Sequence, residues 1–100
     1  MLGNTEKALQ AYQQFLEISK QLAKDYPTSV TAQRDLLVCY YKLASLQETL
    51  QQPAAALWFY QKALAIAEQL VEIDPLNQTA QNDLSFLRDR VESLSDASEW

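Results

Sequence analysis

Apolar residues recur along the chain at steps of three and four, in four long segments that short polar stretches separate. When such a segment is helical, this spacing gathers its apolar side chains into one stripe that faces a core. The pattern predicts helices over about residues 5–25, 29–50, 53–73 and 77–93. No segment shows the alternation of apolar and polar residues that is typical of a strand. We therefore expect an all-α fold of four helices, each antiparallel to the next.

The stripes also predict which side chains form the core. They comprise Ala8, Tyr12, Phe15, Ser19, Leu22 and Tyr26 in the first segment, flanked by Leu9, Leu16 and Ala23; Ala32, Leu36, Cys39, Leu43, Leu46 and Leu50 in the second; Ala56, Tyr60, Ala63, Ala67 and Leu70 in the third; and Ala80, Leu84, Leu87, Val91 and Leu94 in the fourth. Residues 95–100 are polar apart from the terminal tryptophan, so we expect them to form a frayed tail.

Prolines and capping residues mark the ends of the segments. The residue before a proline is driven out of the helical region, so Pro27 and Pro75 are expected to end the first and third helices. Pro53 suits the first turn of the third helix. Residues 1–4, which contain the single glycine, are expected to form a turn. The expected N-caps are Asn4 or Thr5, Thr28 or Ser29, and Asn77.

The sequence contains an internal repeat with a period of 48 residues, in which residues 52–75 align with residues 4–27. The identical pairs include Ala56 and Ala8, Tyr60 and Tyr12, Leu64 and Leu16, Ile66 and Ile18, Leu70 and Leu22, and Pro75 and Pro27. Thr-Ala-Gln and Asp-Leu then recur within residues 31–36 and 79–84. A fixed period of this size is the signature of a stacked repeat architecture.

Residues 37–64 are similar to a tetratricopeptide repeat. In that family the first helix carries an aromatic, a leucine and a small residue, and the second carries a small residue, an aromatic and an alanine. These slots are filled here by Tyr40, Leu43, Ala44, Ala56, Tyr60 and Ala63. Gln47 departs from the pattern, because the family has a second aromatic there. The period is also longer than the family's usual 34, since two insertions of seven residues lengthen both helices of a hairpin by ~10 Å.

The resemblance implies an α-solenoid in which the helices follow the order B-A-B-A, with one complete motif between two half-motifs. Solenoids usually need about three repeats for stability, whereas this chain spans two periods. We therefore expect the chain to be a fragment of a longer array. The alternatives are that its longer helices compensate, or that its exposed terminal helices pair with another copy to form a homo-oligomer.

Charge and composition narrow the classes of partner and compartment. The net charge is −5, which argues against binding to nucleic acid or to an acidic membrane surface. No apolar run approaches the ~20 residues of a membrane helix. Cys39 is the only cysteine, so an internal disulfide is excluded and a reducing, cytoplasmic location is expected.

The chain also lacks most residue types that catalysis requires. It contains no histidine, one cysteine and one glycine, which disfavours catalytic triads, zinc sites and glycine-rich phosphate loops. We interpret Asp89 and Glu92 as part of a solvated charged face. Cys39 lies on an apolar stripe, so we interpret it as a small core residue and not as a redox thiol. We expect neither enzyme activity nor a cofactor.

The resemblance implies a binding face on the second and fourth helices. The residues expected to face it are Val38, Tyr41, Lys42, Ser45 and Glu48, followed by Phe86, Asp89, Arg90 and Ser93. Val38 and Phe86 are equivalent in the repeat, as are Lys42 and Arg90, so each pair is expected to be neighbours. Such a face suits an extended or helical peptide with acidic residues. Alternatively, the two cations pair with Glu48, with Asp89 or with water.

Trp58 and Phe59 are expected to differ, one packing between repeats and the other lying on the outer surface, where an aromatic patch would indicate self-association. In the repeated Asp-Leu pairs, Leu36 and Leu84 are expected to point inward while the aspartates bond a neighbouring helix or water. The main hypothesis is a protein-interaction module that binds a peptide or a partner domain. The alternative is a structural spacer or self-association unit within a larger protein.

Overall fold

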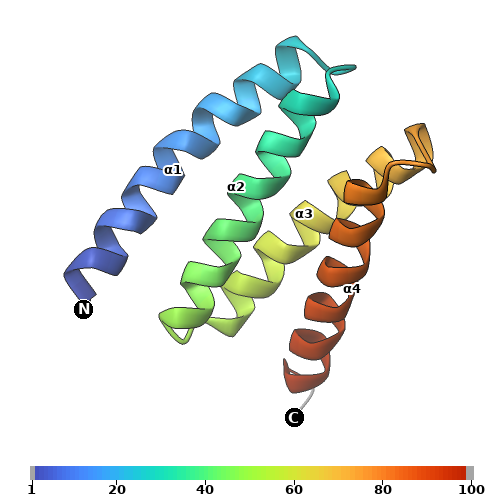
Figure 1. Ribbon diagram of the computed structural model, residues 1–100. Coiled ribbons are helices and arrows are strands. Elements are labelled where there is room, and N and C mark those ends of the chain that lie inside the picture. Colours follow the sequence, from blue (N-terminus) through green and yellow to red (C-terminus); the bar gives the residue numbers. More distant parts are fainter. Residues whose placement is uncertain (1, 99–100) are drawn as a thin grey trace.

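The computed structural model describes residues 2–98, and this part of the chain consists of four α-helices. Their bounds are Leu2–Asp25 for α1, Val30–Thr49 for α2, Pro53–Ile73 for α3 and Gln78–Ser98 for α4. Each helix runs antiparallel to the one before it (Figure 1). The predicted all-α class and the four helical segments are confirmed.

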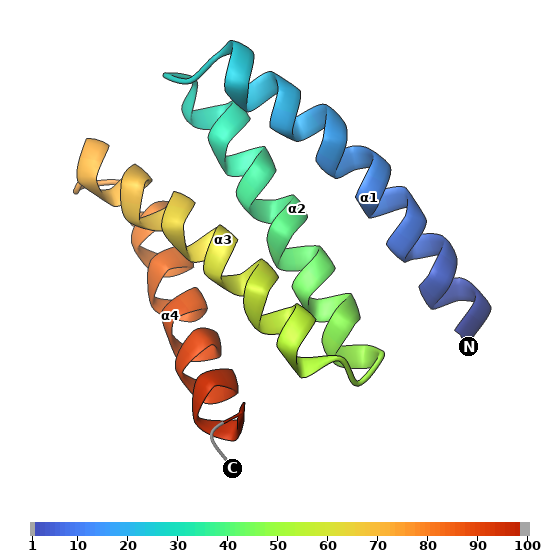
Figure 2. The ribbon, with the colours of Figure 1, turned by 180° about the vertical axis from the view of Figure 1, so that it is seen from behind.

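The helices form a sequential stack. Within the described residues, backbone contacts join only α1 with α2, α2 with α3, and α3 with α4. Helices α2 and α4 run in the same direction, and α3 lies behind α4 in Figure 1 and in front of it in Figure 2. Because α1 and α4 do not meet, the bundle is open and its two outer helices each have one neighbour.

Local side-chain hydrogen bonds begin the second and fourth helices as expected. The Oγ of Ser29 accepts a hydrogen bond from the backbone N–H of Ala32 at 3.1 Å, and the Oδ1 of Asn77 accepts one from Ala80 at 3.1 Å. Each bond satisfies a backbone donor that the first turn leaves free. Pro53 occupies the start of α3, where its missing N–H has no cost.

The turns that follow α1 and α3 are built alike, which explains why Thr-Ala-Gln recurs. The side-chain amide of Gln33 donates to the backbone carbonyl of Pro27 at 3.4 Å, and that of Gln81 donates to the carbonyl of Pro75. The glutamine therefore ties the start of one helix to the proline that ended the previous one. The same residue is used twice because the same turn is built twice.

The expected turn at residues 1–4 is wrong over its described part, because α1 begins at Leu2 and Gly3 is helical. The equivalent turn after α2 does form. There Gln51 adopts a left-handed φ of 58°, and the N–H of Gln52 donates to the carbonyl of Gln47 at 2.8 Å. Backbone hydrogen bonds to the last turn of α2 hold this turn. Gly3 and Asn4 instead belong to α1, so neither Asn4 nor Thr5 is its N-cap.

The expected end of the fourth helix is also corrected. Helix α4 continues to Ser98 instead of ending near Ser93. Leu94 packs against the core and Ser95 is half-buried, so contact with the rest of the fold extends the helix beyond its last stripe residue. The remainder of the expected tail, residues 99 and 100, lies outside the described residues.

Helices α2 and α3 supply most of the core. Its fully enclosed members include Leu43, Ala44, Ala56, Ala63, Ala67 and Leu87. Small alanines on α3 allow the neighbouring backbones to approach closely, while each buried leucine contributes about 1.5–3 kcal/mol. Leu36 and Leu84 are half-buried against this cluster, as predicted. Phe59 also packs against it, whereas Trp58 is exposed, which confirms that the two aromatics differ.

Helix α1 is less covered than its stripe predicts. Leu16, Ser19 and Ala23 are buried against α2. Phe15, Leu22 and Tyr26, expected inside, are exposed, as is Ile18. The reason is that α1 contacts one helix only, so a stripe broad enough for two neighbours keeps one edge in solvent.

Cys39 lies in the core, as its position on the stripe predicted. Its sulfur is 3.4 Å from the Oγ of Ser19 on α1, and both residues are buried. Because the hydroxyl and the thiol satisfy each other, a polar pair is accommodated between α1 and α2 without a loss of hydrogen bonding.

Candidate functional site

A groove of about 510 Å³ lies between α2 and α4. Its lining residues are Arg34, Leu37, Val38 and Tyr41 from α2 and Asn82, Asp83, Phe86 and Leu87 from α4. The two helices are parallel and do not touch through their backbones, so side chains alone bridge them. Buried Leu37 and Leu87 belong to the core beneath the groove. The walls are therefore held by the same helices that build the fold.

Aromatic side chains form the middle of the groove. The rings of Tyr41 and Phe86 meet edge to face with their centroids 5.5 Å apart, a geometry that the ring quadrupoles favour. Phe86 nevertheless remains 46% exposed. Val38, which lies one helical turn before Tyr41, lines the same groove. This surface thus offers a preformed apolar contact beside an open space.

An ion pair closes the groove near the start of both helices. The Nε of Arg34 lies 3.2 Å from the Oδ2 of Asp83. Both side chains are partly exposed, so the pair is worth little for stability, but it fixes the separation of α2 and α4 at this level. It also bears out the expectation that Asp83 bonds a neighbouring helix.

Near the end of α2 a second polar cluster joins three helices. The carboxylate of Glu48 accepts a hydrogen bond from the Tyr60 hydroxyl at 2.6 Å and forms an ion pair with Arg90. The Arg90 guanidinium also lies over the Tyr60 ring, 5.6 Å from its centroid. Burial and the hydrogen bond to Glu48 raise the pKa of Tyr60 to about 12. This cluster therefore locks α2, α3 and α4 together.

The structure brings together only some of the residues expected to bind a ligand. Val38, Tyr41 and Phe86 line one groove. The other six expected residues lie on the same two helices, where Lys42, Ser45, Asp89 and Ser93 are exposed and Glu48 and Arg90 are half-buried. Because Arg90 is bound to Glu48 and Tyr60, the alternative in which a carboxylate of the chain takes up the cation holds for this residue. Lys42 lies 5.2 Å from the Tyr41 ring centroid.

Sequence reasoning missed Arg34 and Asn82, which also line the groove. Arg34 stands one position before the repeated Asp-Leu pair and carries no stripe or motif signal of its own. Its role appears only when α4 places Asp83 beside it. The repeated aspartate was the available signal, since it predicted a bond to a neighbouring helix without saying which.

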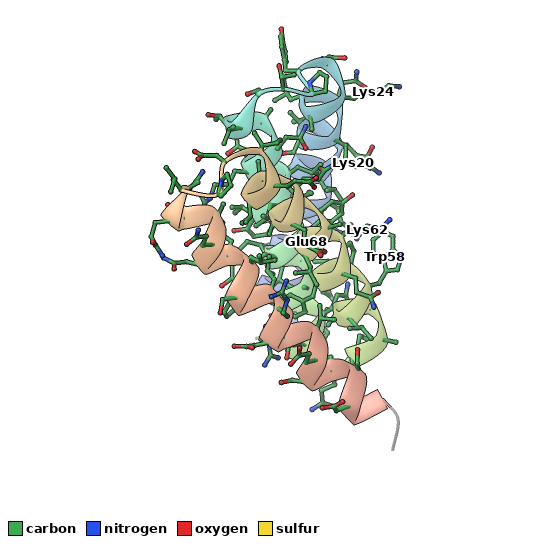
Figure 3. All side chains as sticks on the ribbon, turned by 90° about the vertical axis from the view of Figure 1, so that its right-hand side faces the viewer. Lys20, Lys24, Trp58, Lys62 and Glu68 are labelled. Carbon is green, nitrogen blue, oxygen red and sulfur yellow. The ribbon has the colours of Figure 1, made fainter. Side chains whose placement is uncertain are left out.

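Charged side chains of both signs lie on the side formed by α1 and α3, where Figure 3 labels three lysines and Glu68. Lys20 and Lys24 of α1 and Lys62 of α3 point outward together with Trp58 (Figure 3). The Nζ of Lys62 lies 5.1 Å from the Trp58 ring centroid, which stabilises both side chains by a cation–π contact. The lysines come from segments about 40 residues apart, so only the fold brings them together.

The described part of the chain was also searched for metal-binding clusters and for membrane-spanning helices. Residues 2–98 contain no group of three or more cysteine, aspartate or glutamate side chains arranged to hold a metal ion. None of the four helices in that range combines the length and the apolar character needed to cross a bilayer.

Comparison with protein-family models, with curated proteins and with solved structures finds no match to this chain.

Proposed function

We propose that this chain is a non-catalytic protein-interaction module that binds a peptide or a partner domain in the groove between α2 and α4. The observation that carries the proposal is Phe86, which stays 46% exposed although it is packed against Tyr41 on the groove wall. An exposed aromatic held rigidly beside a concave surface is the type of anchor that dominates binding energy at interfaces. The repeated turns and the resemblance to the tetratricopeptide family support a scaffold of that kind, in an extended-helix form.

The chemistry of the groove defines the ligand. Val38, Tyr41 and Phe86 favour an apolar or aromatic side chain as the main contact. The two arginines nearby are bound to Asp83 and Glu48, so Lys42 is the cation of α2 that is open to a ligand carboxylate. We therefore propose a peptide with an apolar anchor and one acidic residue. A cytoplasmic location agrees with the unpaired Cys39.

Peptides selected from a random library against the whole chain test this function. The Phe86→Ala variant is expected to lose at least about tenfold in affinity for the selected peptides, because an interface anchor is worth 2 kcal/mol or more. The Tyr26→Ala variant is the control, since Tyr26 is an exposed aromatic residue outside the groove. Equal affinity of both variants for the peptides would show that the groove assignment is wrong.

The role of Lys42 is tested separately with the same peptides. Lys42→Glu is expected to weaken acidic peptides about threefold to tenfold and to reduce the salt dependence of binding. Lys62→Glu makes the same charge change on α3, outside the groove, and is expected to leave binding unchanged. If both substitutions weaken binding alike, only the net charge of the protein matters and the groove carries no specific cation site.

A structural role is the second candidate, because α1 keeps an apolar edge exposed. Sedimentation over a range of concentrations separates the two functions. A spacer or self-association unit is expected to form dimers or longer assemblies that Phe86→Ala does not disturb. A monomer that binds selected peptides favours the interaction module.

A further inference from the structure

Helix α1 carries an apolar edge that nothing in the described structure covers. Phe15, Ile18 and Leu22 follow one another at steps of three and four, and they are 58%, 60% and 44% exposed. The residues that follow them by 48 positions are Ala63, Ile66 and Leu70 of α3. These are 0%, 8% and 3% exposed. The same stripe is therefore buried on one helix and open on its repeat.

One helix accounts for this difference. The packing of α1 on α2 is repeated by the packing of α3 on α4, so this contact is common to both stripes. Helix α3 also packs against α2, whereas α1 packs against no second helix within residues 2–98. The burial of the α3 stripe therefore comes from α2. The open edge of α1 is shaped like the surface on which α2 lies.

A polar part of the interface is repeated as well. On α3, the Tyr60 hydroxyl donates to Glu48 from the end of α2, and Arg90 binds the same carboxylate. Subtracting 48 from Tyr60 and Arg90 gives Tyr12 and Lys42. Tyr12 lines a cavity of about 440 Å³ together with Phe15 and Val38. Arg34, Asp35 and Cys39 also line this cavity. The phenol that binds Glu48 thus recurs on α1, and the counterpart of Glu48 would belong to the helix that covers α1, as Glu48 belongs to the helix that covers α3.

We infer that this edge of α1 binds an amphipathic α-helix that lies antiparallel to α1, as α2 lies on α3, and that carries a carboxylate near its C-terminal end. The carboxylate accepts a hydrogen bond from the Tyr12 hydroxyl. The apolar face of the bound helix covers Phe15, Ile18 and Leu22. Because Phe15 replaces the smaller Ala63, the bound helix presents a small residue at that level.

A second copy of the chain is a poor occupant, because its own outer helix is polar on the corresponding face. On α2, the residues at the same steps of three and four are Leu37, Tyr40 and Ala44, and all three are buried. Adding 48 gives Ser85, Arg88 and Glu92 of α4, all exposed. A polar outer face is typical of a helix that ends a repeat array. Stacking α4 of one copy on α1 of another would bury these charged groups against apolar side chains.

A peptide with the sequence of residues 29–52, in which Cys39 is replaced by serine, is a direct probe. It contains the helix that covers α3 together with Glu48. Titration of the full chain with this labelled peptide, followed by fluorescence anisotropy, is expected to show one-to-one binding and a gain of helical circular dichroism. Ile18→Lys in the protein is expected to weaken binding at least about a hundredfold, since it places a charge against the apolar face.

Matched controls separate this surface from the rest of the molecule. Ile73→Lys makes the same substitution at a residue that is 67% exposed at the end of α3, and it is expected to bind the peptide as the unmodified protein does. Phe86→Ala, which tests the groove, is also expected to leave peptide binding unchanged. Loss of binding in Phe86→Ala would place the peptide in the groove and would overturn the inference.

The carboxylate is tested by a double-mutant cycle. Glu48→Gln in the peptide is expected to weaken binding about tenfold to the unmodified protein, because hydrogen bonds to charged groups contribute about 1.5–3 kcal/mol. The same peptide change is expected to have no effect on a protein that carries Tyr12→Phe. Absence of peptide binding, equal binding by Ile18→Lys, or a dimer that Ile18→Lys dissolves and Ile73→Lys does not, would each overturn the inference.

Discussion

The hydroxyl of Tyr60 on α3 donates a hydrogen bond of 2.6 Å to the carboxylate of Glu48 on α2. This bond joins the end of one hairpin to the start of the next, and Arg90 extends it to α4. Three of the four helices therefore meet at one polar cluster. The stability of the stack and its response to pH both depend on this contact.

Tyr60→Phe removes the hydroxyl and leaves the rest of the ring in place. The free energy of unfolding is expected to fall by about 1–2 kcal/mol, because Glu48 loses a hydrogen bond while it stays partly buried. Unfolding in urea measures the change. Tyr26→Phe, at an exposed tyrosine, is the control and is expected to change stability by less than about 0.5 kcal/mol. Equal effects of the two substitutions would show that the bond contributes nothing.

Alkaline pH is expected to destabilise the fold through the same residue. Burial holds the pKa of Tyr60 at about 12 in the folded chain, above the value of about 10 for an exposed tyrosine. Between these two values the folded state retains a proton that the unfolded state has lost, so stability is full below pH 10 and falls as pH rises toward 12. The expected slope reaches about 1.4 kcal/mol per pH unit.

Urea unfolding at a series of pH values, together with the ultraviolet absorbance of tyrosinate, tests this pH dependence. Tyr60→Phe is expected to remove part of the alkaline slope. Burial also raises the pKa of Tyr40, so Tyr40 contributes a slope of the same sign that remains in this variant. A Tyr60→Phe variant with an unchanged alkaline slope would contradict the assignment to Tyr60.

Gln51→Gly is expected to stabilise the chain. Gln51 adopts a φ of 58°, a conformation that costs a residue with a Cβ about 1–2 kcal/mol and costs glycine little. Part of this gain is lost to the greater freedom of glycine in the unfolded chain, which leaves a net increase of about 0.5–1 kcal/mol. Gln52→Gly is the control, because Gln52 has a φ of −116°, and it is expected to destabilise. Thermal unfolding of both variants decides between them.

Leu43→Ala tests whether the core is assigned correctly. Leu43 is 0% exposed, so its truncation is expected to lower the free energy of unfolding by about 2–5 kcal/mol through lost burial and the cavity that remains. Leu76→Ala deletes the same atoms from a residue that is 91% exposed and is expected to change stability by less than about 0.5 kcal/mol. A loss below 1 kcal/mol for Leu43→Ala would place that residue outside a packed core.

The spacing of apolar residues was sufficient to predict the four helices, because each stripe is long and its ends are marked. Ser29 and Asn77 cap α2 and α4 as their side-chain chemistry predicts. The repeat also predicted correctly that Val38 and Phe86 share a groove. These features depend on local chemistry and on a regular period, both of which are present in one sequence.

Other features depend on neighbours that a stripe does not identify. Phe15 and Leu22 occupy the positions that Ala63 and Leu70 occupy on α3, where they are buried. The spacing of apolar residues does not predict whether a second helix covers α1. The sequence offers Arg90 several acceptors, and the one that it binds, Glu48, lies 42 residues away. Each of these outcomes is decided by packing and not by the local sequence.

The contact between Ser19 and Cys39 gives the chain an internal reporter of helix detachment. The thiol is enclosed between α1 and α2, and α1 is held by α2 alone. An alkylating reagent can therefore reach the sulfur when α1 lifts away while the other three helices stay assembled. The alkylation rate of Cys39 measures how often this terminal helix opens, and it is expected to exceed the rate set by complete unfolding.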